Sequence, residues 1–438
     1  MPDVTLKPVT EPFTAAFSPP GSKSLTNRAL VLAALAEGTS ELSNVLFADD
    51  TLVMIECLTR LGFRLEIDRP RNAIRVTGLS GRIERDQAEL FCGNSGTTIR
   101  FLTALCAVGK GRFNLDGIPR MRQRPIGDLV ALLKNLGVRV EYVMQEGFPP
   151  VLVLADGLPG GIGRFGGSQS SQFLSAVLQV APYARNEVRI DLDGPQTSWP
   201  YVAMTMRLMD EFGVTPELVR DRLTGEPRQI IIPHGSPYRA VNYLIEPDAS
   251  NASYFLAAAA LRPGAKVTIE GLGKRSLQGD VGFADVMHHM GADLVFGADF
   301  ITVRGPERLE PVEVDLSGMP DTAQTLAVVA LFAQGTTTIR GLHTLRVKET
   351  DRIAALASEL TKLGADVVVE DDDLSITPPR GGRLLPAAID TYDDHRMAMS
   401  FALAGTRAEG VTIKDAECVN KTYPRYFEDL ARVTGVGV

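Results

Sequence analysis

The stretch Pro20-Gly21-Ser22-Lys23-Ser24-Leu25-Thr26-Asn27-Arg28 runs directly into an apolar segment, Ala29 to Ala36. A glycine-led turn with hydroxyl residues at a helix start leaves backbone N–H groups unpaired, and such groups attract anions. Lys23 adds a point charge, and Arg28 adds a planar guanidinium that suits a carboxylate or a phosphate. A serine-capped helix with solvated basic residues would have the same sequence, so this stretch alone leaves both interpretations open.

The chain contains this pattern six times, counting the copy that begins here. A small-residue apolar helix, a turn and a β-rich run recur every 70 to 80 residues or so, roughly twice the period of a solenoid repeat. A second helix ending in an apolar residue and Gly follows most copies, and Gly there suits the left-handed residue that closes a helix. These helix ends are Leu61-Gly62, Leu136-Gly137, Phe212-Gly213, Met290-Gly291 and Leu363-Gly364, and the last, Thr434-Gly435, is degenerate. Each copy is therefore predicted to be a small α/β unit. The copies are Arg28 to Val45, Thr98 to Gly117, Ser170 to Gly194, Ala252 to Gly271, Thr322 to Gly341 and His395 to Ala416.

Three of the predicted helices are apolar nearly all round. They are the helix that opens the first copy, the one over Tyr254 to Leu261, and the one from Thr325 to Phe332. A helix of this kind is buried on every face. We therefore expect helices packed inside a wrapping of sheet and outer helices, unlike doubly wound folds, which put the sheet in the middle.

Six copies divide naturally into three and three. We expect one domain over residues 21–244 and a second that joins residues 1–20 to residues 246–438. The crossings are placed at Pro19-Pro20-Gly21 and at Ile245-Glu246-Pro247-Asp248. Two crossings close together would permit the domains to close over a ligand.

All six helix starts carry capping chemistry. If each half has threefold symmetry, its three buried helices are parallel and their N-termini share a face, so that two opposed faces would aim several helix dipoles at one cleft. The starts are Ser22-Lys23-Ser24, Asn94-Ser95-Gly96-Thr97, Ser168-Gln169-Ser170-Ser171-Gln172, Asp248-Ala249-Ser250-Asn251, Pro320-Asp321-Thr322 and Asp393-Asp394-His395-Arg396. Caps alone do not explain the cations near these starts, which are Lys23, Arg28, Arg120, Arg122, Arg124, Lys348, Arg352, Arg396 and Lys421.

One of these cationic segments also carries acids. Lys348 and Arg352 are expected one turn apart on one helix face, with Glu349 and Asp351 beside them. That arrangement suits an anion site with a nearby acid or base. An ordinary charged first turn is the alternative.

Composition excludes several classes of protein. The formal net charge of −8 argues against binding nucleic acid or an anionic membrane, so an anionic ligand would need a local basic cluster. The four cysteines, Cys57, Cys92, Cys106 and Cys418, are scattered, which fits reduced thiols better than disulfides or zinc. We find no signal peptide and no apolar run of membrane-spanning length. We therefore expect a cytoplasmic protein, a monomer without metal or cofactor.

Long motifs then point to one family. The chain resembles the 5-enolpyruvylshikimate-3-phosphate (EPSP) synthase family of 3-phosphoshikimate 1-carboxyvinyltransferases. The resemblance covers essentially the whole chain, and it implies an α/β fold of two similar domains. Each domain would contain three βαβαββ units with buried parallel helices inside, and the active site would lie in the interdomain cleft. The motifs are Pro20 to Arg28, Gly93-Asn94-Ser95-Gly96-Thr97-Thr98-Ile99-Arg100, Arg124-Pro125-Ile126, Ser170 to Leu174, Asp321, Arg346 to Arg352, Asp393 to Ala398 and Lys421-Thr422.

The resemblance implies a function and a set of site residues. The enolpyruvyl group of phosphoenolpyruvate would pass to the 5-hydroxyl of shikimate 3-phosphate, releasing phosphate, in the shikimate pathway that leads to chorismate and aromatic amino acids. Shikimate 3-phosphate would be held by Lys23, Ser24, Arg28, Ser170, Ser171, Gln172, Ser198, Tyr201, Asp321 and Lys348. Phosphoenolpyruvate would be held by Lys23, Asn94, Gly96, Arg124, Gln172, Arg352, Arg396 and Lys421.

The resemblance also implies catalytic roles. Asp321 would be the base on the 5-hydroxyl, Glu349 would transfer a proton at the methylene carbon, and Lys23 would assist at the bridging oxygen. His395 is included as a residue lining the site. The chain departs from the family at Phe101, Trp199 and Thr344, where Pro, a basic residue and Asn are frequent.

Two alternatives remain at this stage. The sister enolpyruvyl transferase family that acts on UDP-N-acetylglucosamine has Asn after its first-helix Lys, where this chain has Ser24. A non-catalytic phosphometabolite sensor on the same scaffold would need no acid and base.

The stretch Gly161-Ile162-Gly163-Arg164-Phe165-Gly166 matches the glycine spacing of dinucleotide-binding motifs. It does not open a helix directly after a strand, and no acidic residue follows at the required distance, so we predict a loop there.

Overall fold

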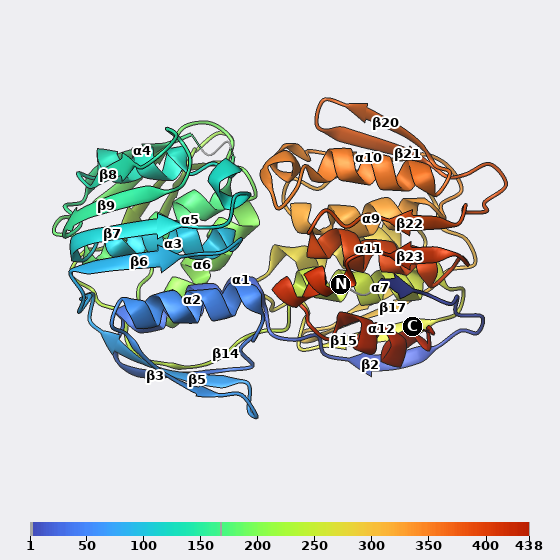
Figure 1. Cartoon of the computed structure of the whole chain (residues 1–438), viewed down its shortest axis with the longest axis horizontal. Coiled ribbons are helices and arrows are strands. Elements are labelled where there is room, and N and C mark those ends of the chain that lie inside the picture. The colour runs from blue at the N-terminus through green and yellow to red at the C-terminus, as the bar shows by residue number, and fades with distance from the viewer. Residues whose placement is uncertain (1–2, 167–168, 438) are drawn as a thin grey trace. The chain divides into compact units, whose positions relative to one another are not determined.

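The computed structural model describes residues 3–166 and 169–437 (Figure 1). The chain divides into two compact units. Unit 2 is Gly21–Ile245, and unit 1 combines Met1–Pro20 with Glu246–Val438. In each of the six predicted copies, an apolar helix followed by a strand is present.

Within its described residues, unit 2 contains three four-stranded sheets. In every sheet the first pair of strands is parallel and the other pairs are antiparallel. The first sheet has the order β14 (Asn242–Leu244), β3 (Glu37–Ser43), β5 (Ala73–Leu79) and β4 (Arg64–Asp68). The second is β6 (Gln87–Phe91), β7 (Lys110–Asp116), β9 (Val151–Asp156) and β8 (Arg139–Tyr142). The third is β10 (Gly161–Phe165), β11 (Val188–Leu192), β13 (Pro227–Ile232) and β12 (Glu217–Arg220).

Two kinds of helix accompany these sheets. The inner helices are α1 (Lys23–Leu35), α3 (Gly96–Cys106) and α5 (Ser171–Val180), and α3 and α5 each connect two parallel strands. The outer helices are α2 (Asp49–Arg60), α4 (Gly127–Asn135) and α6 (Trp199–Glu211). Short 3-10 turns are η1 (Met121–Gln123) and η2 (Ala181–Tyr183).

Unit 1 repeats this plan. Its first sheet has the order β16 (Asp293–Phe296), β17 (Phe300–Arg304), β15 (Lys266–Glu270) and β2 (Thr14–Phe17). The second is β18 (Glu313–Asp315), β19 (Thr337–Arg340), β21 (Asp373–Thr377) and β20 (Asp366–Glu370). The third has three strands, β1 (Val4–Thr5), β23 (Val411–Ile413) and β22 (Ala387–Ile389). Its inner helices are α7 (Ala249–Leu261), α9 (Ala323–Ala330) and α11 (His395–Gly405), and its outer helices are α8 (Phe283–His289), α10 (Arg352–Lys362) and α12 (Tyr426–Thr434). The 3-10 turns are η3 (Gly279–Gly282), η4 (Pro320–Thr322), η5 (His343–Val347) and η6 (Ala416–Lys421).

Strands next to the crossings do not pair with their sequence neighbours. The strand just before α1, β2, pairs in parallel with β15 of unit 1. The place beside β3 is filled by β14, from the end of unit 2. The sixth sheet is completed by β1, which pairs antiparallel with β23. Each pairing satisfies strand-edge N–H and C=O groups that would otherwise be exposed.

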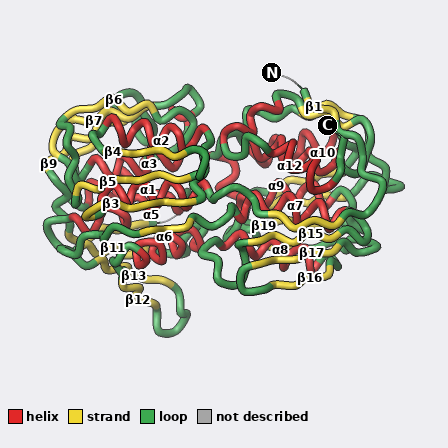
Figure 2. The backbone as a smooth tube through the Cα atoms, turned by 90° about the horizontal axis from the view of Figure 1, so that it is seen from below, coloured by secondary structure: helices red, strands yellow, loops and turns green. Residues whose placement is uncertain are grey.

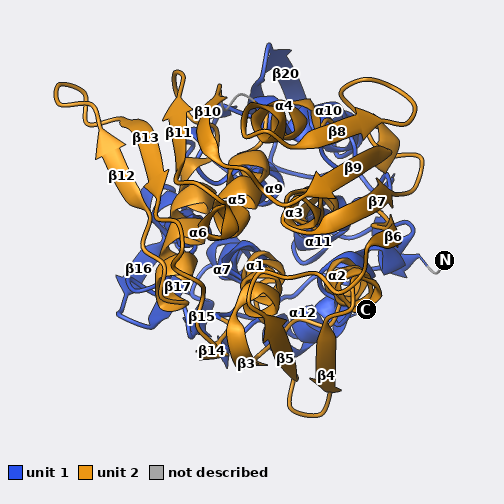
Figure 3. Ribbon diagram, turned by 90° about the vertical axis from the view of Figure 1, so that its left-hand side faces the viewer, with its two compact units in different colours: residues 1–20, 246–438 blue, residues 21–245 orange. Residues whose placement is uncertain are grey.

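The inner helices form the core of each unit. Every residue of α3, α7, α9 and α11 is buried. The helices α1, α3 and α5 pack against one another, as do α7, α9 and α11. In unit 2, Figure 3 shows the three inner helices surrounded by strands and outer helices, and Figure 2 shows strands lying over the helices. The prediction of buried helices inside a sheet wrapping is therefore confirmed, although the helix placed at Thr325 to Phe332 spans Ala323–Ala330.

Glycine closes the outer helices as the sequence predicts. The φ angles lie between 74° and 101° at Gly62, Gly137, Gly213, Gly291, Gly364 and Gly435. The predicted loop over Gly161 to Gly166 is wrong, because Gly161–Phe165 forms strand β10 and pairs in parallel with β11. In the described part of the chain, the helices are too short or too polar to cross a membrane.

One glycine permits a close contact between an inner helix and its sheet. A Cβ atom on Gly305, just after β17, would lie 2.1 Å from the carbonyl oxygen of Arg262 and 2.3 Å from that of Ala259, at the end of α7. We predict that Gly305→Ala lowers the free energy of unfolding by about 1–3 kcal/mol, because the backbone must move to relieve the overlap. Gly166→Ala is the control, since its Cβ would meet no atom within 4 Å. Urea unfolding followed by circular dichroism measures both, and equal stabilities would contradict the prediction.

Candidate active site

The first turns of the three inner helices of unit 2 lie together. Asn27 Nδ2 of α1 donates to Thr97 Oγ1 of α3 at 2.7 Å. Arg100 Nη1 of α3 donates to Gln172 Oε1 of α5 at 2.7 Å. Since each of these residues lies in the first half of its helix, the three N-termini are at one end, as the sequence predicts for parallel helices.

Serine caps all three of these helices. Ser22 Oγ accepts from the N–H of Leu25, Ser95 Oγ from that of Thr98 and Ser170 Oγ from that of Gln172. Ser168, which the sequence also placed at the third start, lies outside the described residues. The capping expected for these three starts is confirmed.

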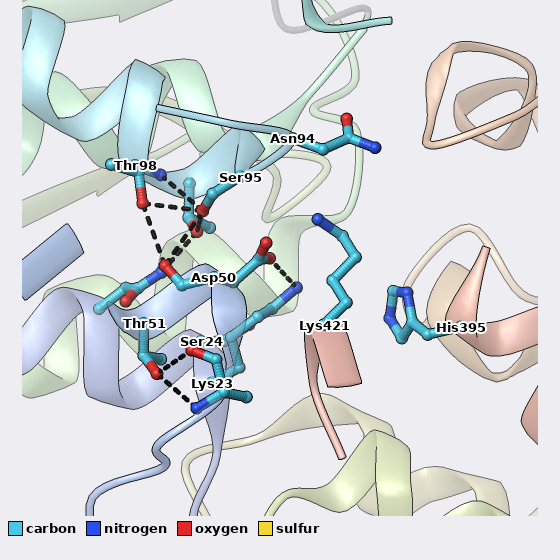
Figure 4. Close-up of polar contacts among 12 residues, drawn as sticks. Lys23, Ser24, Asp50, Thr51, Asn94, Ser95, Thr98, His395 and Lys421 are labelled. Atoms are coloured by element: carbon cyan, nitrogen blue, oxygen red, sulfur yellow. Dashed lines mark hydrogen bonds and ion pairs between the residues drawn. The ribbon is translucent and has the colours of Figure 1, made fainter. Parts of the chain in front are cut away.

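Lys23 is held beside an acidic residue of the outer helix α2. Its Nζ lies 3.4 Å from Asp50 Oδ2, and both side chains are largely buried (Figure 4). The Asp50 backbone carbonyl accepts hydrogen bonds from Ser95 Oγ at 3.4 Å and Thr98 Oγ1 at 3.3 Å. The first turn of α2 therefore contacts the starts of both α1 and α3.

Arg28 is a buried guanidinium held by neutral groups. Its Nε donates to Thr205 Oγ1 at 2.7 Å and its Nη1 to the Ser24 carbonyl at 3.0 Å. Its Nη2 lies 3.4 Å from both Ser175 Oγ and the Tyr201 carbonyl. The guanidinium also stacks on the Phe101 ring, 5.1 Å from the centroid.

Burial without a neutralising partner affects the ionisation of Arg28. Among the described residues, no carboxylate lies within ion-pair distance of it, and burial lowers its pKa to about 10. The group is still charged near neutral pH. A buried charge without a counter-ion is costly, so an anionic ligand at this position would be favoured.

A second arginine set surrounds the start of α3. Arg124 Nη1 donates to the Asn94 carbonyl at 2.9 Å and to its side-chain oxygen at 3.3 Å. A Cβ on Gly96 would lie 2.7 Å from Arg124 Nη2, so this position accepts only glycine without movement of the guanidinium. Arg100 holds Gln172 and also donates to the Pro125 carbonyl at 3.0 Å, next to Arg124.

Of the remaining candidates of unit 2, Ser24 and Tyr201 contact Arg28 through their carbonyls. Ser198 is the left-handed residue before α6, with φ of 51°. Ser171 is the buried first residue of α5.

In unit 1, the starts of α7, α9 and α11 are joined in the same way. Ser253 of α7 and Thr325 of α9 share a hydrogen bond of 3.0 Å. Asp248 caps α7 and Asp394 caps α11. Capping of α9 was also predicted, and this is wrong: Thr322 makes no side-chain capping bond, because a 3-10 turn, η4, precedes the helix.

Asp321, in η4, faces cations. Its Oδ1 lies 3.6 Å from Lys348 Nζ and 3.3 Å from Arg352 Nη1, and its Oδ2 accepts from Arg396 Nη2 at 2.9 Å. Arg396 also donates to the Tyr254 hydroxyl at 3.3 Å. The buried Tyr254 hydroxyl has its pKa raised to about 12 by burial, against the opposing effect of Arg396.

Arg352 connects the other acids of unit 1. It donates to Asp394 from Nε at 2.7 Å and to Glu349 Oε2 from Nη2 at 3.1 Å. Burial opposes its charge, but the three carboxylates, Asp394, Glu349 and Asp321, outweigh that and raise its pKa. Lys421 Nζ lies 3.9 Å from Glu349 Oε1, and His395 Nδ1 lies 3.6 Å from Asp394.

The prediction that Lys348 and Arg352 lie one turn apart on the same helix face is wrong. α10 begins only at Arg352, with Asp351 as its cap, so Lys348 precedes the helix in extended backbone. The two cations are brought together by Asp321 rather than by helical spacing.

Several residues that orient the site escaped sequence reasoning. Asp50 and Thr205 lie on the outer helices α2 and α6, whereas Ser175 and Tyr254 lie in the second turns of the inner helices α5 and α7; no local pattern distinguishes any of the four.

Each unit contains three buried inner helices, and lysine and arginine side chains lie near the N-termini of several of them. In this class of α/β protein, such helix ends favour anions. The chain belongs to the EPSP synthase (3-phosphoshikimate 1-carboxyvinyltransferase) family, whose model matches residues 9–430. The resemblance stated from the motifs is thereby confirmed.

Named relatives agree with this assignment. The chain is 45% identical over 436 residues to a 3-phosphoshikimate 1-carboxyvinyltransferase of Vibrio vulnificus (strain YJ016), covering 99% of both chains. It is 46% identical to one from Sulfurovum sp. (strain NBC37-1), covering 99% of this chain and 100% of the relative. A solved EPSP synthase from Acinetobacter baumannii is similar with a TM-score of 0.81 and 25% identity, covering 99% of this chain and 98% of that one.

Proposed function

We propose that this protein is an enzyme that transfers the carboxyvinyl group of phosphoenolpyruvate to the 5-hydroxyl of shikimate 3-phosphate. The products are 5-enolpyruvylshikimate 3-phosphate and inorganic phosphate. Family membership over nearly the whole chain supports this assignment. The observation that carries it is that Arg352 binds Asp321 and Glu349 at once, which places two carboxylates beside cations in one cluster.

Both substrates are anions, and the helix starts supply cations for them. We assign shikimate 3-phosphate to the groups around Arg28, with Asp321 and Lys348 of unit 1. We assign phosphoenolpyruvate to the arginine and lysine residues at the remaining helix starts. These residues are Lys23, Arg124, Arg352, Arg396 and Lys421, together with Asn94, Gly96 and Gln172.

The proposed reaction is an addition followed by an elimination. Glu349 gives a proton to the methylene carbon of phosphoenolpyruvate while Asp321 takes the proton of the 5-hydroxyl, whose oxygen bonds to the cationic carbon. The tetrahedral adduct then returns a methyl proton to Glu349, and its bond to the phosphate oxygen breaks, with Lys23 assisting at that oxygen. The proton that Asp321 took from the 5-hydroxyl passes through solvent to the released phosphate, so both acids return to their starting states. Each positioned acid or base contributes roughly 10²–10⁴ in rate, and the cations supply preorganised charge.

The experiment that tests this function measures phosphate release by the purified protein. We predict release only when phosphoenolpyruvate and shikimate 3-phosphate are both present. Equal release with UDP-N-acetylglucosamine in place of shikimate 3-phosphate would identify the sister enzyme. Binding of shikimate 3-phosphate without any phosphate release would identify a sensor.

A further inference from the structure

A strained segment leads into the start of α11. Between Ile389, at the end of β22, and His395, the chain places Tyr392 at φ of 55° and Asp393 at φ of 54°. Left-handed backbone at a residue with a side chain costs roughly 1–2 kcal/mol, so two in succession persist only where the surroundings hold them.

A buried carboxylate on α10 holds this segment. The Glu359 side chain is fully buried, and its Oε1 accepts from the Tyr392 hydroxyl at 2.6 Å. Its Oε2 accepts from the N–H of Asp390 at 3.1 Å and from Lys362 Nζ at 2.7 Å. The Tyr392 residue is 42% exposed, so packing covers its ring only partly and the hydroxyl bond to Glu359 helps to hold it.

The same helix holds the far end of the segment. Arg352, at the start of α10, binds Asp394, while Glu359 lies seven residues further along, about 10 Å at the helical rise of 1.5 Å per residue. Asp394 in turn accepts from the N–H of Arg396, and Arg396 contacts Asp321. The backbone geometry of the segment therefore sets the positions of Asp394 and Arg396 relative to Asp321 and Arg352.

We propose that Glu359 and Tyr392 are positioning residues for the carboxyvinyl transfer, because their hydrogen bond holds the left-handed pair that sets Asp394 and Arg396. The proposal rests on the proposed function. Neither residue belongs to the helix starts that bind anions, and neither needs to touch a substrate to act.

Tyr392→Phe tests the proposal with little risk to folding, since it removes one hydroxyl from a ring that is already exposed. We expect KM for phosphoenolpyruvate to rise at least about 5-fold, because small misplacements of binding groups weaken substrate positioning. KM for shikimate 3-phosphate should rise less than KM for phosphoenolpyruvate, since most of the groups assigned to it surround Arg28 in unit 2 and only Asp321 is linked to Arg396. Tyr238→Phe is the control for loss of a tyrosine hydroxyl, because that hydroxyl donates to the Gln179 carbonyl within unit 2.

Amide hydrogen exchange supplies a readout that does not depend on activity. In Tyr392→Phe, the N–H groups of Arg396 and Met397, both bonded to Asp394, should exchange at least about 10-fold faster, while amides in the middle of α10 stay unchanged. Unchanged exchange at these two amides overturns the proposal. A lowered melting temperature with unaltered kinetic constants also overturns the proposal, because it would mean that the bond between Tyr392 and Glu359 stabilises the fold without positioning the site.

Glu359→Gln provides the second variant. The amide keeps one acceptor but cannot accept from the Tyr392 hydroxyl, the Asp390 N–H and Lys362 together, so the same two amides should lose protection. If the wild type lacks transferase activity altogether, the proposed function fails, and the exchange rates in both variants still decide whether this bond positions α11.

Discussion

Glu349→Gln is expected to lower kcat by about 10²–10⁴-fold while changing the dissociation constants of both substrates less than about 3-fold, because it removes a proton donor without removing a cation. Glutamine has nearly the same shape, and Arg352 keeps its bonds to Asp394 and Asp321. Initial rates give kcat, and titration calorimetry gives the dissociation constants.

Asp351→Asn is the matched control for this charge loss. Asp351 lies two residues away, is partly exposed, and caps α10 through the N–H of Ala354. Asparagine caps a helix about as well as aspartate, so the rate should stay within about 2-fold of wild type. A Glu349→Gln enzyme that keeps more than a tenth of the wild-type kcat would exclude Glu349 as the proton donor.

Arg28→Lys is expected to weaken binding of shikimate 3-phosphate by about 30-fold or more. Losing one partner of a buried, hydrogen-bonded charge pair costs about 2–5 kcal/mol, and a lysine cannot reproduce the planar fork. The Thr205 hydroxyl and the Ser24 and Tyr201 carbonyls would also lose a donor. Titration calorimetry with shikimate 3-phosphate alone measures the effect.

The control is Arg60→Lys on the outer helix α2. Arg60 is exposed and pairs with Glu56 at 2.7 Å, and exposed ion pairs contribute little. Its dissociation constant for shikimate 3-phosphate should match wild type. Equal affinities of the Arg28→Lys and wild-type proteins would place the phosphate of shikimate 3-phosphate elsewhere.

Much of the fold follows from local pattern. The apolar run after Arg28 predicts a buried helix because its hydrophobic residues occupy every face. The serine residues before α1, α3 and α5, and the glycines that end the outer helices, have conformational preferences that act within a few residues. The motifs at Ser22 to Arg28 and at Lys348 to Arg352 likewise identify the family from sequence alone.

Local pattern fails where partners are distant in the chain. Gly161–Phe165 is a strand because it pairs with β11, which its own glycines do not suggest. Lys348 leaves the expected helical face because Asp351 starts the helix later and Asp321 attracts the lysine. The absence of a side-chain cap on α9 has the same origin, since the acid available there binds cations instead.

The sequence by itself therefore determined the six helix-and-strand units, the burial of the inner helices and the family, because periodicity and capping are properties of neighbouring residues. Only the tertiary structure decided that β14 completes the first sheet, that Thr205 and Ser175 hold Arg28, and that Glu359 fixes the approach to α11. These choices depend on contacts between residues up to 201 positions apart, whose free energy comes from burial and hydrogen bonding in the packed chain.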